Sequence, residues 1–331
     1  APGMALEMLC RAFPEHENWM EWYGALALYA EYLKTTAGFS SPYGMFPQSI
    51  YNIDEEHKRS VYGINQSSLA GAGRYEKEEP MYKLQVTTGM KLGDGYYLRF
   101  FPVWYSHRGN FGIQLAQGKA LAAASHLRKD LDGINVSRNQ LEWIIGKNPF
   151  CQSTTWGVGY DFAPLYTPSS GHIVGALPVG IQTLENRDIP YWPAAICYNY
   201  KEIWSNPTAR WLWLLEDVTG PARVSGTIEQ TEFSKVAFIE EESGKEYKAA
   251  LDKKSERFSI ELPEGRYTAR CGTKEKQITV LSGETYQIDF NTIVDISVSA
   301  EELGGGSVII TAMAKGSGET SIELRGFNLR P

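Results

Sequence analysis

The sequence predicts a multidomain protein in which a mainly helical part is followed by an antiparallel β-sandwich. Its 331 residues exceed the length at which a single hydrophobic core stops growing, so two or more domains are expected. Before residue 219, apolar residues recur at three- and four-residue steps, which is typical of helices. After Pro221, short alternating segments are separated by Gly, Ser and charged turns, which is typical of strands. The expected domains are 1–219, 220–290 and 291–331.

Local signals place the helices of the first part. Apolar residues at helical spacing predict a helix over residues 17–37. Ser137 followed by Gln140 matches a capping box, so we expect another helix to begin at Ser137. Asn206 and Pro207 form an N-cap and first-turn proline, which predicts the start of the last helix of this part.

The second part reads as seven short strands. Strands at a spacing of about 8 to 12 residues are typical of an antiparallel sandwich. Pro263 and the following Glu-Gly-Arg-Tyr resemble the strand entry of carboxypeptidase-regulatory-like, transthyretin-type sandwiches, and that resemblance implies a spacer for residues 220–290. Residues 291–331 form a β-rich tail, expected to be the start of another immunoglobulin-like module. The expected strands are 224–228, 236–239, 247–251, 257–262, 267–270, 276–280 and 285–290.

Composition excludes several classes of function. The net charge of −7 is spread along the chain without a Lys/Arg block, which argues against nucleic-acid or anionic-lipid partners. No apolar run approaches the roughly 20 residues needed to span a bilayer. The four cysteines are scattered, and zinc, dinucleotide and P-loop motifs are missing, so no metal and no cofactor is expected. The chain starts without a signal-peptide pattern, so its location is inferred from its function.

The aromatic content points to carbohydrate. The chain has 9 Trp, 19 Tyr and 13 Phe, and Trp and Tyr offer flat apolar faces with a polar handle, on which sugar rings stack. Many of these residues fall in long stretches rich in Gly and Pro, at 39–53, 86–110 and 148–200, and loops of that length are usually functional. A large aromatic core is the alternative explanation.

Three motifs in the first part carry a family resemblance. Residues 143–150 read Trp-Ile-Ile-Gly-Lys-Asn-Pro-Phe, residues 153–159 end in Gly-Val-Gly, and residues 198–202 read Tyr-Asn-Tyr-Lys-Glu. Together they resemble the C-terminal third of family-nine glycoside hydrolases. The resemblance implies a six-hairpin (α/α) toroid over residues 1–219 and makes Glu202 the general acid. The paired aspartates of that family have no counterpart here, so a missing N-terminal half of the same protein is an expected partner.

An inverting hydrolysis needs a protonated acid and an ionised base about 6.5 to 9.5 Å apart. Aromatic neighbours would shield Glu202 from water and favour the protonated form, whereas the helix start downstream favours the carboxylate. Asp161 and Asp188, in loops near the expected cleft, are the candidate bases. Alternatively, they are ligands of a structural calcium, or Glu202 only caps the helix.

The expected cleft also contains substrate-binding candidates. His107 and Arg108 precede a helix as Glu202 does, so a toroid would bring them to the same end, where Arg108 could bind hydroxyls or an anionic group of a sugar. The residues expected to stack on or contact the sugar are Trp104, Tyr105, Trp156, Tyr160, His172 and Trp192.

The sequence therefore predicts a glycoside hydrolase that acts on a polysaccharide or oligosaccharide outside the cytoplasm, with inverting chemistry favoured and retaining chemistry left open as the alternative. Two rivals stay open. One is a non-catalytic glycan-binding or scaffold protein that kept the aromatic residues of the cleft. The other is a polysaccharide lyase on a similar toroid, which would use a Tyr/His or Arg/His pair beside a uronate.

Overall fold

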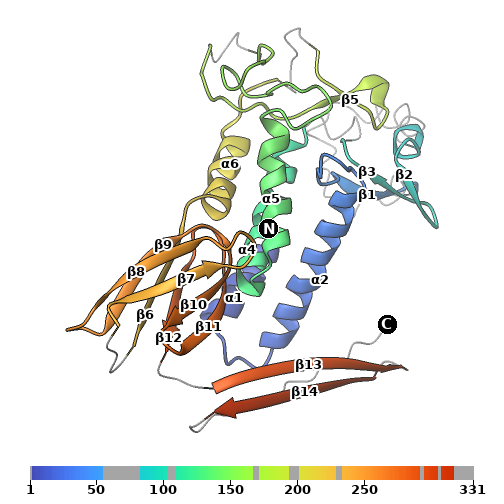
Figure 1. Cartoon of the computed structure of the whole chain (residues 1–331). Helices are drawn as coiled ribbons and strands as arrows, with labels where there is room; N and C mark the ends of the chain where they lie inside the picture. The colour runs from blue at the N-terminus through green and yellow to red at the C-terminus, as the bar shows by residue number, and fades with distance from the viewer. Residues whose placement is uncertain are drawn as a thin grey trace. The chain divides into compact units, whose positions relative to one another are not determined.

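The computed structural model describes residues 2–54, 83–102, 109–166, 171–193, 201–228, 233–290, 294–304 and 307–316. The chain divides into two compact units. Unit 1 comprises residues 1–12 and 23–218, and unit 2 comprises residues 13–22 and 219–331. Figure 1 labels their helices and strands.

Unit 1 is built around helix α4. Its described α-helices are α1 (Pro2–Ala12), the larger part of α2 (Trp19–Gly38), α4 (Phe111–Arg128), α5 (Leu131–Ile144) and α6 (Ser205–Val218). Helix α4 packs against α1, α5 and α6. It also shares a core with α2, in which Leu26 and Leu33 lie against Leu121 and Ala124. Small side chains such as Ala120 and Ala124 are fully buried and let neighbouring helices approach closely.

Two small sheets complete unit 1. Strands β1 (Ser49–Asn52), β3 (Tyr96–Arg99) and β2 (Met90–Gly93) pair antiparallel in the order β1-β3-β2. Strands β4 (Gln182–Thr183) and β5 (Pro190–Tyr191) flank the short helix η4 (Leu184–Asn186). Figure 1 shows that the loops after α5 gather at one end of the helices of this unit.

The toroid interpretation of this part is wrong. A six-hairpin toroid needs six pairs of helices. The described residues of unit 1 contain α1, α2, α4, α5 and α6 and a single helical turn at 83–86, together with two small sheets. The helical signals were local, and they could not reveal that sheets and irregular loops occupy much of the chain between the helices.

The expected start of α5 is also wrong. The helix begins at Leu131, where the side chain of Asp130 accepts a hydrogen bond from Gly133 N at 3.1 Å. Ser137 and Gln140 are both fully buried inside the helix. The Gln140 side chain accepts a hydrogen bond from Phe46 N at 3.0 Å, so a tertiary contact uses the group that the capping box assigned to a helix end.

Unit 2 contains one seven-stranded sheet, in the order β11-β10-β7-β8-β9-β6-β12. Strand β8 meets β9 only through Leu251 and Asp252, so the sheet has a narrow seam between two broader halves. Phe238 from one half and Phe258 from the other are buried in the same core, with ring centroids 6.0 Å apart. The strands are β6 (Ala222–Thr227), β7 (Lys235–Glu240), β8 (Glu246–Asp252), β9 (Arg257–Leu262), β10 (Gly265–Cys271), β11 (Lys274–Val280) and β12 (Thr285–Asp289).

This topology corrects the prediction of an antiparallel, carboxypeptidase-regulatory-like sandwich. All seven strands belong to one hydrogen-bonded order, and β12 lies parallel to β6, with Thr285 opposite Arg223 and Asp289 opposite Thr227. Alternation along a strand predicts its two faces but not its neighbours, so the sequence could not reveal this pair. After this sheet, β13 (Val294–Gly304) and β14 (Ser307–Gly316) form an antiparallel hairpin.

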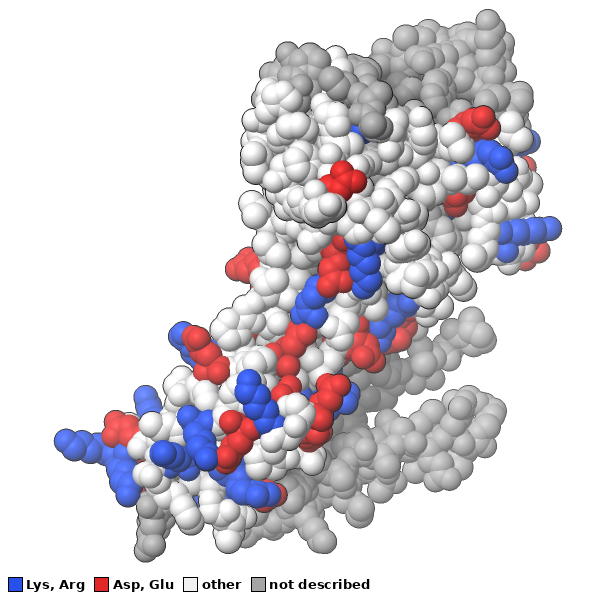
Figure 2. Space-filling view, turned by 45° about the horizontal axis from the view of Figure 1, so that its top comes forward, with Lys and Arg blue, Asp and Glu red and all other residues white. Residues whose placement is uncertain are grey.

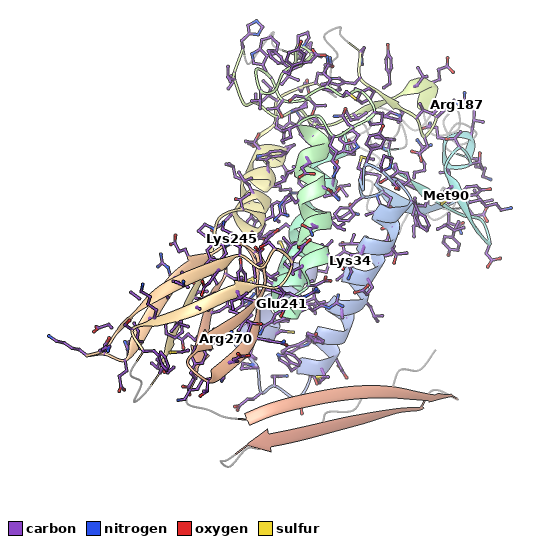
Figure 3. The ribbon with its side chains drawn as sticks, viewed as in Figure 1. Lys34, Met90, Arg187, Glu241, Lys245 and Arg270 are labelled. Atoms are coloured by element: carbon purple, nitrogen blue, oxygen red, sulfur yellow. The ribbon has the colours of Figure 1, made fainter. Side chains whose placement is uncertain are left out.

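Asp130 links the start of α5 to α2. Its Oδ2 lies 2.7 Å from Lys34 Nζ, a side chain labelled in Figure 3, and 3.9 Å from Arg128. Burial of the Asp130 side chain opposes its ionisation, but the hydrogen bonds from Lys34 and the amide of Gly133 outweigh this effect and lower the pKa of Asp130. The ionised carboxylate therefore stabilises the fold.

We predict that Asp130→Ala lowers the free energy of unfolding by about 1 to 2 kcal/mol, and that Asp130→Asn costs less because Asn keeps a capping oxygen. Because the folded-state pKa is lowered, the ionic contribution is present above the unfolded pKa of about 3.9 and is lost as the pH falls through the folded value. Urea unfolding from pH about 7 to pH about 2 measures both effects. A stability difference between wild type and Asp130→Asn that stays constant over this range would contradict the ionic role.

Candidate functional site

The candidate site lies on the loop layer, which we define as residues 146–166, 171–193 and 201–204. The segment 173–181 runs through its centre. Within this segment, Ala176 O accepts a hydrogen bond from Trp156 N at 3.2 Å, and Val179 N donates to Glu202 O at 3.0 Å. Gly157 and Gly175 make the tight turns of this layer at positive φ, 67° and 84°.

The end of α5 anchors the loop layer. Asn148 Nδ2 donates to Trp143 O at 2.7 Å and to Gln152 O at 2.9 Å, so one buried side chain satisfies two carbonyl groups. The backbone N and the hydroxyl of Thr154 both donate to Ile144 O at 2.9 Å. The Asn-Pro motif after α5 therefore connects a helix to a long loop.

Glu202 and Trp204 form a hydrogen-bonded pair just before α6. Trp204 Nε1 donates to Glu202 Oε2 at 3.1 Å, and Trp204 is 38% exposed. Because Glu202 O is held by Val179 N, the backbone that carries the pair is fixed to the centre of the loop layer. The pair presents a carboxylate beside an accessible indole.

The second aromatic group contains Trp156, whose backbone is bonded to Ala176 of the central segment. The Trp156 ring lies 4.8 Å from the ring of His172 and 5.2 Å from that of Phe162. His172 is exposed. Ala176 and Val179, which bind the backbones of Trp156 and Glu202, are three residues apart and hence at most about 11 Å apart. The two aromatic groups therefore border one short stretch of chain.

Tyr160 and Asp161 follow the glycine turn on the same layer. Tyr160 is fully exposed. Asp161 is also exposed, and its carbonyl oxygen accepts from Ser153 N at 2.8 Å. Asp161 is thus accessible to solvent, as expected of a catalytic base. Among the contacts of the described residues, none joins its carboxylate to that of Glu202.

Asp188 holds a different part of the unit together. Its carboxylate accepts hydrogen bonds from Phe100 N at 3.0 Å and Phe101 N at 3.0 Å, and it lies 3.8 Å from Nε of the fully buried Arg99. The side chain of Asp188 is 8% exposed. Burial raises the pKa of Asp188, although Arg99 and the two amides oppose the shift. These contacts connect the β4–β5 loop to the end of β3.

Trp192 and Lys201 lie inside the loop layer. Trp192 is 7% exposed, and Lys201 Nζ lies 4.3 Å from the centre of its ring. Lys201 is fully buried and donates hydrogen bonds to Pro164 O, at 3.2 Å, and to Pro193 O. The structure therefore shows Trp192 as part of an internal contact.

Four predicted binding residues, Trp104, Tyr105, His107 and Arg108, lie outside the described residues. The sequence interpretation did not include two exposed aromatic residues, Tyr191 and Trp204, among its sugar contacts. Both lie close in sequence to Glu202 within an aromatic run, which was the signal that could have identified them.

Within the described ranges, no group of three or more His, Cys, Asp or Glu side chains is arranged to hold a metal ion. Of the helices that the structure describes, none combines the length and apolar character needed to cross a bilayer.

Comparison with known proteins supplies no family. No known protein family matches the chain, and no curated protein matches it. One solved structure that is similar to it is a DUF3823 family protein from Bacteroides ovatus, with 16% identity, 28% of this chain and 57% of that chain covered, and a TM-score of 0.18. This score does not establish a shared fold. Since the chain also lacks the expected toroid architecture, the assignment to family-nine glycoside hydrolases is wrong.

We predict that Asp188→Asn lowers the free energy of unfolding by about 1 to 3 kcal/mol, because an amide nitrogen would face backbone donors and Arg99 would lose its anionic partner. The matched variant is Asp161→Asn, at an exposed carboxylate, which should stay within about 0.5 kcal/mol of wild type. Chemical denaturation at neutral pH measures both. Equal stability of the two variants would contradict the structural role of Asp188.

Proposed function

We propose that this chain is a non-catalytic glycan-binding protein that acts outside the cytoplasm and recognises a polysaccharide through the loop layer. The observation that carries the proposal is the pair formed by Glu202 and Trp204. An indole offers a flat apolar face to a sugar ring, and a hydrogen bond to Glu202 Oε2 holds this indole in place. A carboxylate has about four acceptor positions, so Glu202 can also accept hydrogen bonds from sugar hydroxyls.

The neighbouring aromatic residues support an extended ligand rather than a single sugar. Trp156 with His172 forms one aromatic group, and Trp204 is a separate ring whose neighbour Glu202 is bonded through its backbone to the same central segment. Tyr160 and Tyr191 add two exposed rings to the layer. Several separate rings along a short stretch suit a polymer that offers successive sugar units.

The low charge of the layer fits a hydroxyl-rich partner. Between residues 148 and 184, Asp161 is the only Asp, Glu, Lys or Arg in the sequence. In Figure 2, few charged side chains interrupt the surface over this end of unit 1. Nucleic acids and anionic lipids are bound mainly by clusters of Lys and Arg, and residues 148–184 contain neither.

Binding is favoured over hydrolysis by the contacts of the carboxylates. An inverting reaction needs an acid and a base on opposite sides of the scissile bond. Asp188, one of the two candidate bases, already accepts hydrogen bonds from two backbone amides beside a buried arginine. A polysaccharide lyase would use a Tyr/His or Arg/His pair beside a uronate, and the Arg/His candidates Arg108 and His107 lie outside the described residues.

We predict that Trp204→Ala lowers the affinity for a bound polysaccharide at least about tenfold, which corresponds to about 1.4 kcal/mol. The loss should follow from removing the stacking face and freeing the carboxylate of Glu202. The control is Trp213→Ala. Trp213 is 45% exposed on α6 and lies about 12 Å along the helix from its first residue, Ser205, so its removal should leave affinity unchanged.

Affinity electrophoresis against soluble polysaccharides, followed by titration calorimetry with any polymer that retards the protein, provides the measurement. Equal losses in Trp204→Ala and Trp213→Ala would remove the loop layer from the explanation. Failure of wild type to bind any polymer in the panel would reject glycan binding. Release of reducing ends by wild type, lost in Glu202→Gln, would reject the non-catalytic assignment.

A further inference from the structure

Lys201 is the buried cation of the loop layer. Its side chain is fully buried, and Nζ donates to the carbonyl oxygens of Pro164 and Pro193 and lies over the ring of Trp192. Its own carbonyl oxygen accepts a hydrogen bond from Tyr166 N at 2.9 Å. Lys201 thus connects the segment 201–204 with two others, the segment that contains Pro164 and Tyr166 and the segment that contains Trp192 and Pro193.

We infer that Lys201 is a positioning residue for the glycan site, and this inference rests on the proposed function. The three segments that it joins carry or adjoin the exposed groups of the site. Pro193 and Trp192 follow the exposed Tyr191, and Lys201 directly precedes Glu202 and, two residues later, Trp204. Fixing Nζ between Pro164 and Pro193 therefore fixes Tyr191 relative to the Glu202–Trp204 pair.

The chemistry of the contact explains why an ammonium group suits this position. A fully buried cation is costly to desolvate, and apolar residues of similar volume often replace buried ions without loss of stability. An apolar side chain would fill the same space, but it could neither donate to the two carbonyl groups nor be attracted to the face of Trp192. What Lys201 adds is therefore a fixed spacing between segments rather than packing alone.

The test compares two lysines that each lie over a tryptophan. Lys201→Met keeps length and apolar volume but removes the ammonium group, and with it the contacts to Pro164 O, Pro193 O and the Trp192 ring. Lys119→Met is the matched control, because Lys119 Nζ lies 4.7 Å from the ring of Trp213, between α4 and α6 and outside the loop layer, and pairs with Asp217 at 2.6 Å. We expect Lys201→Met to lower the affinity for the polysaccharide that retards wild type in affinity electrophoresis at least about tenfold, measured at a temperature where the variant is fully folded. Lys119→Met should lower the melting temperature and leave affinity within about twofold of wild type.

Hydrogen exchange provides a readout that needs no glycan. In Lys201→Met, the amides of Tyr166 and Val179, which donate to the carbonyls of Lys201 and Glu202, should exchange faster, while amides inside α4 and α5 stay as protected as in wild type. Lys201→Arg, which keeps the charge and the donors, should recover part of both losses.

The outcomes separate the two proposals. Binding and exchange in folded Lys201→Met that equal those of wild type would overturn the positioning role. Faster exchange across the whole unit would also overturn it, because Lys201 would then support the fold in general. If wild type binds no polysaccharide, the proposed function fails, and local loosening of Tyr166 and Val179 still decides whether Lys201 fixes these segments.

Discussion

The carbonyl groups at the end of α5 are the point on which the site depends. A helix leaves its last carbonyl groups without intrahelical partners. Here the long loop after α5 provides hydrogen-bond donors for these carbonyl groups through Asn148 and Thr154. The regular secondary structure of the loop layer is limited to the helix η4 and the two-residue pairing of β4 with β5, which is too short to fix the position of the whole layer. Its geometry is set by this attachment to a buried helix and by the few backbone bonds that join its segments to one another.

Polar groups inside unit 1 also connect distant parts of the chain. Gln140 of α5 accepts a hydrogen bond from Phe46 N in the segment after α2. The same side chain accepts a second hydrogen bond, 3.3 Å long, from Gln114 of α4. Buried amides are costly unless they are hydrogen-bonded, so each such contact selects one arrangement of neighbouring segments. Asp188 serves the same purpose at the end of β3.

The sequence predicted elements better than their arrangement. The strands of unit 2 lie close to the expected positions because alternation is a local property, whereas the pairing of β12 with β6 brings together residues about 60 positions apart in sequence and could not be read from it. For α5, a capping box at Ser137 and Gln140 was outweighed by Asp130, whose carboxylate is supported by Lys34 from another helix. The toroid failed because three short motifs can match a family without the fold that usually surrounds them.

The candidate site was predictable to a similar degree. Glu202 was selected through a family resemblance that is wrong, whereas the aromatic residues near it were a local signal, and in the structure Trp204 Nε1 donates a hydrogen bond to its carboxylate. The environment of Asp188 could not be predicted, because the amides that bind it belong to Phe100 and Phe101, nearly 90 positions earlier in the sequence and just after β3. No sequence signal identified Lys201 as buried, because its hydrogen bonds to the carbonyl groups of Pro164 and Pro193 form only when these segments are brought together.

The parallel pairing of β6 and β12 has a mechanical consequence. The chain enters the seven-stranded sheet at the first residue of β6 and leaves it at the last residue of β12, and these neighbouring strands point the same way. Tension applied through the two ends would pull the strands past each other along their lengths. The inter-strand hydrogen bonds, from the pair of Arg223 and Thr285 to that of Thr227 and Asp289, would then bear the load together instead of opening one at a time. Hydrogen bonds loaded together in shear resist extension more than bonds opened one at a time, so the β6–β12 pair is the contact that would have to break before residues 222–289 could be extended from their ends.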